Sequence, residues 1–262
     1  MTTVQGQGRA PGRPRLAELL RQVRAGLASA PPPRAVVDVG GGTGSVAVQL
    51  ADEGLPVTVL DTSAAMLATC AERAADLGPE VGERLRTVQG GAEQASRLLG
   101  PASADGVLCH GVLEVVPQPE VVLAGLALLL RPGGVLSLVV ANRAWLGLRA
   151  ARRGDYLEAL RLLDEPEVVA ASVWRGARER PRQVSPAGPA RAWTAAELRP
   201  WCERAGLEML AEYGLQAFAE PPPEADRDQL EALVELERRA AEREPFRSVG
   251  EFVHLVARRA PG

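Results

Sequence analysis

Short apolar runs alternate with helical stretches over the first 141 residues of the chain. The runs with the length and near-continuous apolar character of buried strands are residues 35–39, 56–60, 85–89, 105–109 and 135–141. The stretches between them that we predict to be helical are residues 44–53, 63–77 and 121–130. Ser63 is a suitable N-cap for the second of these helices. Strands that alternate with helices and are almost continuously apolar predict a parallel sheet buried on both faces.

The pattern changes after Asn142. Residues 143–191 contain ten arginines and six acidic residues, a net charge of +4, and we expect helices near 144–164 and 166–180. The rest of the chain predicts helices at 194–205 and 224–244 and strands at 207–218 and 251–258. The whole pattern predicts an α/β fold with a seven-stranded, mostly parallel sheet and a helical, Arg-rich insertion after the fifth strand.

Composition limits the kinds of protein that fit this pattern. A chain of 262 residues with 46% hydrophobic residues can form one domain with a proper core, here residues 15–262, and a net charge of −3 gives no general attraction to nucleic acid or membrane. Residues 1–14 contain no apolar signal-peptide core and are expected to be a disordered tail. Three scattered cysteines fit a reducing, cytoplasmic location.

A glycine-rich turn follows the first predicted strand and carries the strongest chemical signal. Val36-Val37-Asp38-Val39 leads into Gly40-Gly41-Gly42-Thr43-Gly44, and a helix is predicted to start there. Glycines allow the backbone to approach a ligand closely, and a helix N-terminus offers free N–H groups. Asp38 stands where nicotinamide enzymes usually have an apolar residue. A carboxylate there can help to bind the amino-acid end of S-adenosylmethionine.

Two further strand ends support a nucleoside-type ligand. Asp61 ends the second strand, 17 residues after Gly44, where a doubly wound sheet places the acid that accepts both ribose hydroxyls. The alternative for Asp61 is a capping role before the next helix. Gly90-Gly91-Ala92-Glu93 follows the third strand and stands at the usual adenine position, with the backbone of Ala92 and the side chain of Glu93 as candidates.

His110 follows the fourth strand and is the one candidate for a catalytic residue. A lone histidine is more often packed than functional, but the carboxyl end of a parallel strand is the ligand-binding edge. His254, on a late strand, is interpreted as structural. No His, Cys or acidic residues have the spacing of metal ligands, so no metal is expected.

Several segments together resemble the bacterial tRNA 5-carboxymethoxyuridine methyltransferase family, within the Rossmann-like class I methyltransferases. The segments that carry this resemblance are Cys109-His110-Gly111-Val112-Leu113-Glu114, Leu130-Arg131-Pro132-Gly133-Gly134, Asn142, and the C-terminal Glu244-Pro245-Phe246 and His254. The resemblance covers the chain from about Arg15 onward. It implies transfer of a methyl group from S-adenosylmethionine to the carboxylate of the modified wobble uridine, which gives a methyl ester and S-adenosylhomocysteine.

The resemblance also implies which residues contact the cofactor. These are Arg15 on an N-terminal helix, Gly40, Gly41, Asp61, Ala92, Glu93 and His110; Asp38, Gly42 and Gly44 join them from the motif itself. A carboxylate acceptor is ionised at neutral pH and needs no general base. An alcohol or phenol acceptor would make His110 the candidate base.

Two departures from the family pattern lie on the acceptor side. Ala141 precedes Asn142 where the family leads us to expect Tyr, and Gln216 stands two residues before Phe218 where we expect Arg. An arginine could clamp a carboxylate with two hydrogen bonds, and glutamine cannot. The candidate acceptor-side residues, for tRNA or for a small molecule, are Asn142, Arg149, Arg152, Arg153, Arg191 and Gln216.

Three alternatives to a tRNA methyltransferase remain open. The first keeps the chemistry and changes the acceptor to a small molecule, and the two departures favour it. The second is a nicotinamide oxidoreductase, because Gly42-x-Gly44-x-x-Ala47 partly matches that fingerprint; Asp38 argues against it. The third is a non-catalytic cofactor-binding subunit. The Arg-rich segment 143–191 fits either tRNA phosphates or a solvated cap over the site.

Overall fold

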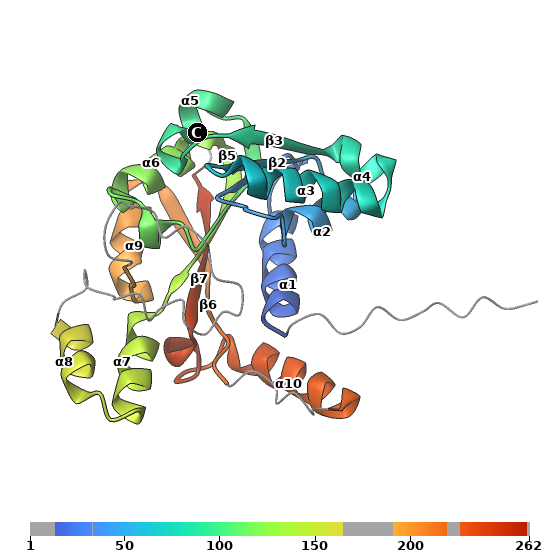
Figure 1. The fold of residues 1–262 in the computed structure, drawn as a ribbon. Coiled ribbons are helices and arrows are strands. Elements are labelled where there is room, and N and C mark those ends of the chain that lie inside the picture. The colour runs from blue at the N-terminus through green and yellow to red at the C-terminus, as the bar shows by residue number, and fades with distance from the viewer. Residues whose placement is uncertain (1–13, 33, 165–190, 219–225, 261–262) are drawn as a thin grey trace, which may run out of the picture.

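Seven strands form one sheet at the centre of the molecule (Figure 1). The computed structural model describes residues 14–32, 34–164, 191–218 and 226–260. The strands are β1 (Val36–Val39), β2 (Val57–Asp61), β3 (Leu85–Gln89), β4 (Ala104–His110), β5 (Leu130–Ala141), β6 (Leu207–Leu215) and β7 (Phe252–Arg259). Their order is β3-β2-β1-β4-β5-β7-β6, and β7 runs antiparallel to both of its neighbours. The predicted seven-stranded, mostly parallel sheet is confirmed.

Helices cover both faces of this sheet (Figure 1). One face packs on α1 (Pro14–Ala28), α2 (Ala47–Asp52) and α3 (Ala64–Leu77), which is followed by α4 (Pro79–Arg84). The other face packs on α5 (Ala95–Leu99), α6 (Pro119–Leu129) and α9 (Ala195–Arg204). The central strands β1 and β4 are buried along almost their whole length because helices cover both of their faces, whereas the edge strands β3 and β6 are partly exposed.

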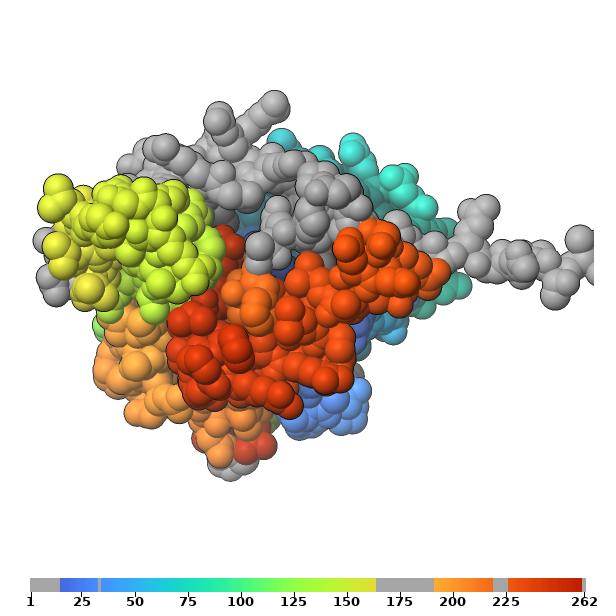
Figure 2. Space-filling view, turned by 90° about the horizontal axis from the view of Figure 1, so that it is seen from below, coloured from blue at the N-terminus to red at the C-terminus, as the bar shows by residue number. Residues whose placement is uncertain are grey.

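The other helices of the described residues lie beyond the end of the sheet at which β5 terminates. They are α7 (Arg143–Arg152), α8 (Tyr156–Asp164) and α10 (Arg227–Ala240). Figure 2, a view onto this end, shows α7 and α8 on one side and α10 on the other. None of the helices in the described ranges is long and apolar enough to cross a membrane.

Most predicted elements are found, with different ends. The predicted helix at 44–53 begins only at Ala47, because Gly40, Gly42 and Gly44 all have positive φ and keep the chain in a turn. The predicted helix at 144–164 is two helices, broken where Gly154 has a φ of 78°. The predicted strand at 207–218 ends at Leu215, because Gln216 has a φ of 57°.

Several other expectations have different outcomes. Ser63 caps α3 as predicted, and its Oγ accepts a hydrogen bond from the Met66 N–H at 3.3 Å. The periodicity did not predict α1, α4 or α5. Pro14, the last residue of the expected tail, begins α1; residues 1–13 and the expected helix at 166–180 lie outside the described residues.

The strand register gathers the candidate residues at one edge of the sheet. Val39 pairs with Leu60 and Cys109, so the carboxyl ends of β1, β2 and β4 are level. Because β7 is antiparallel, its first residue, Phe252, lies opposite both Ala141 and Leu215. The start of β7 therefore joins the ends of β1, β2, β4, β5 and β6 at this carboxyl edge, where open α/β sheets bind ligands.

Candidate functional site

The glycine turn after β1 is held tightly by the protein around it. A Cβ on Gly40 would lie 2.3 Å from Val112 Cγ2, one on Gly41 2.6 Å from Asp38 Oδ2, and one on Gly44 2.4 Å from Cys70 Sγ. Only glycine fits these three positions. Gly42 differs, because a Cβ there would have no atom nearer than 4.0 Å; its φ of 54° still favours glycine. The backbone at Gly42 therefore borders open space.

Two carboxylates flank this turn. Asp61 Oδ2 accepts a hydrogen bond from the Gly42 N–H at 3.0 Å, and Oδ1 accepts one from the Ser63 N–H at 2.9 Å. Asp61 therefore braces the turn and the backbone of Ser63, and it is Ser63 that caps α3. Each oxygen keeps a further lone pair for a ligand hydroxyl.

Asp38 is almost completely buried beside the turn and forms no hydrogen bond with another described side chain. Burial raises its pKa to about 7, and the nearby charge of Asp61 adds to the rise. The two carboxylates repel each other, which is an unfavourable arrangement for the free protein. A ligand with a positively charged group would relieve it.

The end of β3 supplies the next part of the site. Gly90 donates its N–H to the Asp61 carbonyl at 3.0 Å, so the chain after β3 lies beside the end of β2. Ala92 begins a short 3₁₀ helix, Ala92–Gln94, in which Ala92 is half-buried and Glu93 is exposed. The backbone of Ala92 and the carboxylate of Glu93 thus border the same edge as Asp61.

His110 ends β4 and is half-buried at the same edge. Its Nε2 lies 2.8 Å from Ser137 Oγ, which lies 2.8 Å from Nε2 of His254. Nδ1 of His254 lies 2.6 Å from Oε1 of Gln22. Burial lowers the pKa of His110 to about 4, so this ring is neutral at physiological pH.

Arg15 projects from the first turn of α1 toward the carboxyl edge. Its guanidinium carbon lies 4.8 Å from the centroid of the Phe252 ring, a cation–π contact that orients the side chain. The side chain remains exposed. It is therefore a cationic group at the edge where Asp38 and His110 lie.

Asn142 has a structural role that uses both the oxygen and the nitrogen of its side chain. Oδ1 caps α7 by accepting from the Ala144 N–H at 3.0 Å, and Nδ2 donates to the carbonyls of Ser248 at 2.9 Å and Gly250 at 2.8 Å. Both amide protons are used, so the side chain has no donor left for an acceptor molecule. Asn142 lies at the expected edge but acts by holding α7 there.

Gln216 and Arg191 also lie at this edge. Gln216 occupies a left-handed turn after β6, and its carbonyl accepts the Glu251 N–H at 3.1 Å. Arg191 donates its backbone N–H to the Glu114 carbonyl at 2.9 Å, and its guanidinium reaches the Pro117 carbonyl at 3.2 Å. The guanidinium thus caps the loop after β4.

The other arginine candidates lie on or just after α7. Arg152 and Arg153 are exposed at its end, and Arg149 stacks on Trp145 at 5.0 Å. Arg143, at the start of α7, pairs closely with Glu197 and is one of the less exposed arginines. In the described part of the chain, no three His, Cys, Asp or Glu side chains gather as metal ligands would.

Sequence reasoning missed the partners of His110. Ser137 interrupts the otherwise apolar run at residues 135–141 of β5, and the only other histidine of the chain, His254 on β7, pairs with Val139, two residues farther along β5. A buried serine between two histidines is a signal, but only the strand order, with β7 between β5 and β6, reveals it. The interpretation of His254 as structural was incomplete, because its ring is linked to His110 through a single hydroxyl.

Comparisons with known proteins show that the chain is similar to methyltransferases. A family model described as "Methyltransferase domain" matches residues 37–136. The chain is 33% identical over 227 residues to the tRNA 5-carboxymethoxyuridine methyltransferase of Escherichia coli strain K12, which covers 86% of this chain and 79% of that protein. It is 29% identical over 175 residues to a ubiquinone biosynthesis O-methyltransferase of Xanthomonas euvesicatoria, covering 66% of this chain and 62% of that protein.

Solved structures share the fold at lower identity. An S-adenosylmethionine-dependent methyltransferase from Methanosarcina mazei superimposes with a TM-score of 0.59 at 16% identity, over 90% of this chain and 96% of that one. The 1,6-didemethyltoxoflavin-N1-methyltransferase of Burkholderia thailandensis, with its substrate and S-adenosylhomocysteine bound, gives a TM-score of 0.56 at 20% identity, over 95% and 80%.

Proposed function

Because this chain belongs to the family of the tRNA 5-carboxymethoxyuridine methyltransferases, we propose that it methylates the carboxylate of 5-carboxymethoxyuridine at the wobble position of tRNA. The chain is an S-adenosylmethionine-dependent methyltransferase of class I. The observation that carries the choice of acceptor is the 33% identity over 86% of the chain, which extends well beyond the general methyltransferase domain at 37–136. A tRNA acceptor implies that the reaction takes place in the cytoplasm.

The residues at the carboxyl edge fit S-adenosylmethionine. Its sulfonium and ammonium groups are positive, and Asp38 and Asp61 are neighbouring acids, so the ligand supplies the charge that the turn lacks. In this proposal Asp61 binds the ribose hydroxyls, and Ala92 with Glu93 binds the adenine. His110 contacts the cofactor from the end of β4, and Arg15 contacts it from the first turn of α1. The cofactor lies against the backbone of Gly40, Gly41, Gly42 and Gly44.

For this reaction the main task of the protein is to align the acceptor with the methyl group and the sulfur. S-adenosylmethionine supplies an activated methyl group whose leaving group is neutral, so rate is gained mainly by holding the acceptor in line. His110, with a pKa of about 4, is a poor base at neutral pH. A carboxylate acceptor is already ionised and needs no base, whereas a phenol or alcohol would need one. The weak basicity of His110 therefore supports a carboxylate acceptor.

Cationic side chains are available for an anionic acceptor. Arg15 is exposed at the carboxyl edge, and Arg152 and Arg153 are exposed at the end of α7, farther from it. In this proposal Arg15 contacts the cofactor, and the arginines at the end of α7 contact tRNA phosphates. Non-specific phosphate contacts of this kind weaken as salt is added, which gives the tRNA interaction a measurable signature.

The test uses purified protein, deuteromethyl S-adenosylmethionine and tRNA that carries 5-carboxymethoxyuridine. We expect the digested nucleosides to contain a deuterated methyl ester that mild base removes. Absence of label in tRNA, while calorimetry still detects binding of S-adenosylhomocysteine, would reject the tRNA acceptor and leave the methyltransferase. Arg152→Ala with Arg153→Ala should raise KM for tRNA severalfold without changing the affinity for the cofactor.

A small-molecule acceptor is the second candidate, and Gln216 favours it. The family pattern leads us to expect an arginine there, and a glutamine cannot form the same two charged hydrogen bonds with a carboxylate. Relatives that act in ubiquinone biosynthesis match 66% of this chain. Gln216→Arg distinguishes the candidates: an increased rate on modified tRNA supports the tRNA acceptor, and an unchanged negligible rate supports the small molecule.

A further inference from the structure

We propose that Glu18, Gln22, His254 and Ser137 are positioning residues that fix the tautomer of His110, with the proton on Nε2 and the lone pair of Nδ1 toward the carboxyl edge. The inference rests on the proposed function only in placing the cofactor beside His110. It does not depend on the tRNA acceptor.

A continuous line of hydrogen bonds connects the outer surface of α1 with the carboxyl edge. Oε1 of Glu18 lies 2.8 Å from Nε2 of Gln22, and from there the line runs through His254 and Ser137 to His110 with separations of 2.6, 2.8 and 2.8 Å. The four positioning residues are between 0% and 4% exposed. Buried groups of this kind exchange little with water, so each must find its donor or acceptor within the line.

The direction of these hydrogen bonds is set at Glu18. Its carboxylate accepts three hydrogen bonds from Arg21, at 2.7, 3.0 and 3.1 Å, and a carboxylate held in this way can only accept. The group of Gln22 that faces it must therefore be the amide NH₂. The other end of that amide, Oε1, must then accept, so Nδ1 of His254 carries a proton.

The same argument determines which ring nitrogen of His110 carries the proton. Burial lowers the pKa of His254 far below its ordinary value, so the ring is neutral, and with a proton on Nδ1 its Nε2 can only accept. Ser137 has a single hydroxyl proton and gives it to His254. The Ser137 oxygen must therefore accept from His110, which places the proton of that ring on Nε2 and leaves Nδ1 without one.

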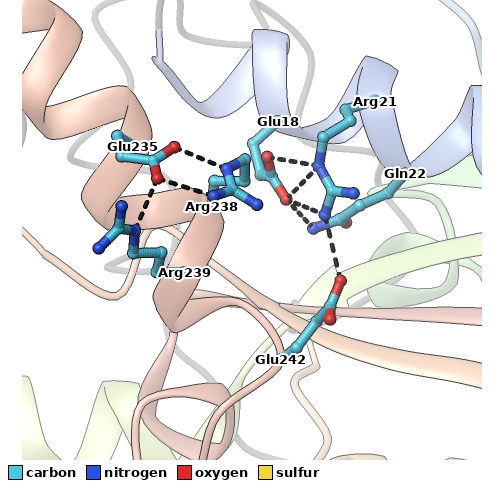
Figure 3. Close-up of polar contacts among 7 residues, drawn as sticks. All are labelled: Glu18, Arg21, Gln22, Glu235, Arg238, Arg239 and Glu242. Atoms are coloured by element: carbon cyan, nitrogen blue, oxygen red, sulfur yellow. Dashed lines mark hydrogen bonds and ion pairs between the residues drawn. The ribbon is translucent and has the colours of Figure 1, made fainter.

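The outer end of the line is fixed by ion pairs between α1 and the α10 region (Figure 3). Arg21 bridges Glu18 and Glu242, which lies 3.3 Å from its Nη2. Glu235 on α10 pairs with Arg238 and Arg239 beside this bridge. These ion pairs therefore fix the orientation of Glu18, and with it the direction of each hydrogen bond in the line.

The tautomer of His110 determines whether its ring accepts or donates a hydrogen bond at the carboxyl edge. With the proton on Nε2, His110 offers Nδ1 as a hydrogen-bond acceptor, which suits the ammonium group of an amino-acid ligand or another N–H donor. The opposite tautomer would turn an N–H toward a cationic ligand and repel it. The line does not transport protons, because the amide of Gln22 in its middle does not relay them; it orients His110.

The first test is nuclear magnetic resonance of the full-length protein with ¹⁵N-labelled histidine. The chain has two histidines, so the assignment is simple. Long-range ¹H–¹⁵N couplings distinguish the two neutral tautomers of each ring. We expect opposite tautomers, Nε2–H for His110 and Nδ1–H for His254. The same tautomer on both rings, or a charged ring at neutral pH, would overturn the inference without any variant having to fold.

The second test links the tautomer to ligand affinity. Ser137→Ala should give His110 a mixture of tautomers and weaken binding of S-adenosylhomocysteine about tenfold, the effect of one lost hydrogen bond. Ser137→Thr keeps the hydroxyl and should restore most of both. Gln22→Leu breaks the line one step earlier, and His254 should lose its Nδ1–H preference.

Ser29→Ala is the matched control, because Ser29 Oγ donates to the Gly26 carbonyl at 2.6 Å, outside this line. It should change neither tautomer nor affinity. Altered affinity in Ser137→Ala with an unaltered His110 tautomer would overturn the positioning role. Intact tautomers and cofactor binding with no methylation of tRNA would reject the proposed acceptor and leave this inference standing.

Discussion

Asp38 is buried next to a second carboxylate, so its protonation state depends on whether a cationic ligand is bound. Its pKa in the folded protein is about 7, above the ordinary value of 3.8. Between these two pH values the folded state holds a proton that the unfolded state has lost. The free energy of unfolding of the free protein therefore falls as the pH rises through this window.

We predict that affinity for S-adenosylmethionine increases as the pH rises through about 7, because the ionised form of Asp38 attracts the cationic ligand. Calorimetric titrations at several pH values measure this. In Asp38→Asn the affinity should be lower and independent of pH over the same range. A pH dependence that survives in Asp38→Asn would assign it to another group, and Glu114, whose buried carboxyl also has a pKa of about 7, is the first to examine.

Gly41 gives a prediction about the turn itself. A Cβ at this position would lie 2.6 Å from Asp38 Oδ2 and 2.8 Å from Val59 Cγ1, so Gly41→Ala must displace the carboxylate or the strand. We expect a loss of about 1–3 kcal/mol in the free energy of unfolding. We also expect weaker binding of S-adenosylhomocysteine, and chemical denaturation and calorimetry measure the two effects.

Gly125→Ala is the matched control for this substitution. Gly125 lies within α6, where an added Cβ meets no atom within 4 Å. Alanine is a better helix former than glycine, so the variant should gain up to about 1 kcal/mol and bind the cofactor as the wild type does. Equal stability of the two variants would show that the turn relaxes around a methyl group.

At the scale of elements, strands were easier to predict than the ends of helices. A strand buried on both faces leaves an apolar run in the sequence, and the strands predicted at 35–39 and 105–109 end within about one residue of β1 and β4. The strand at 85–89, which is only partly buried, was predicted with the observed ends. Helix ends depend on local backbone conformation, which is why α2 starts after Gly44 and why Gly154 separates α7 from α8. The short helices α4 and α5 have too few turns to produce a clear periodicity.

Glu237 shows how one helix sets the conformation of a distant segment. It is 4% exposed on α10, and its two oxygens accept the backbone N–H groups of Ala217 and Phe218, each at 3.0 Å. These bonds hold the chain just after Gln216, at the end of β6. The position of Gln216 at the carboxyl edge therefore depends on a carboxylate from another element.

We predict that Glu237→Gln destabilises the protein by about 1–3 kcal/mol, because the amide NH₂ would face a backbone N–H and leave one buried donor without an acceptor. The midpoint of chemical denaturation measures this loss. Glu235→Gln on the same helix is the control, since the carboxylate of Glu235 lies at the surface and pairs with Arg238 and Arg239 of the same helix, so its midpoint should not move. If both variants behave alike, the contact with residues 217 and 218 does not contribute to stability.

At the scale of the whole molecule, the sequence predicts those parts of the site that are short motifs at the ends of successive parallel strands. Asp38, Asp61 and His110 lie at the carboxyl ends of the parallel strands β1, β2 and β4, and Ala92 lies just after β3, so strand order along the chain is enough to bring them to one edge. Links that depend on later strands were not predictable in this way. Gln22 and His254 are 232 residues apart, and they meet because β7 enters between β5 and β6 and α1 packs on that part of the sheet.

The late insertion of β7 also determines when this site is completed during synthesis. β6 forms its sheet hydrogen bonds with β7, which the ribosome makes after it, so a nascent chain that ends within α10 has β6 but not the strand that joins it to β5. The β1–β4 part of the sheet, with the glycine turn and both aspartates, is by then already synthesised. His110 reaches its final environment only when residues 252–259 have left the exit tunnel. A chaperone or ribosome that delays this last segment would therefore delay activity rather than the formation of the cofactor-binding half.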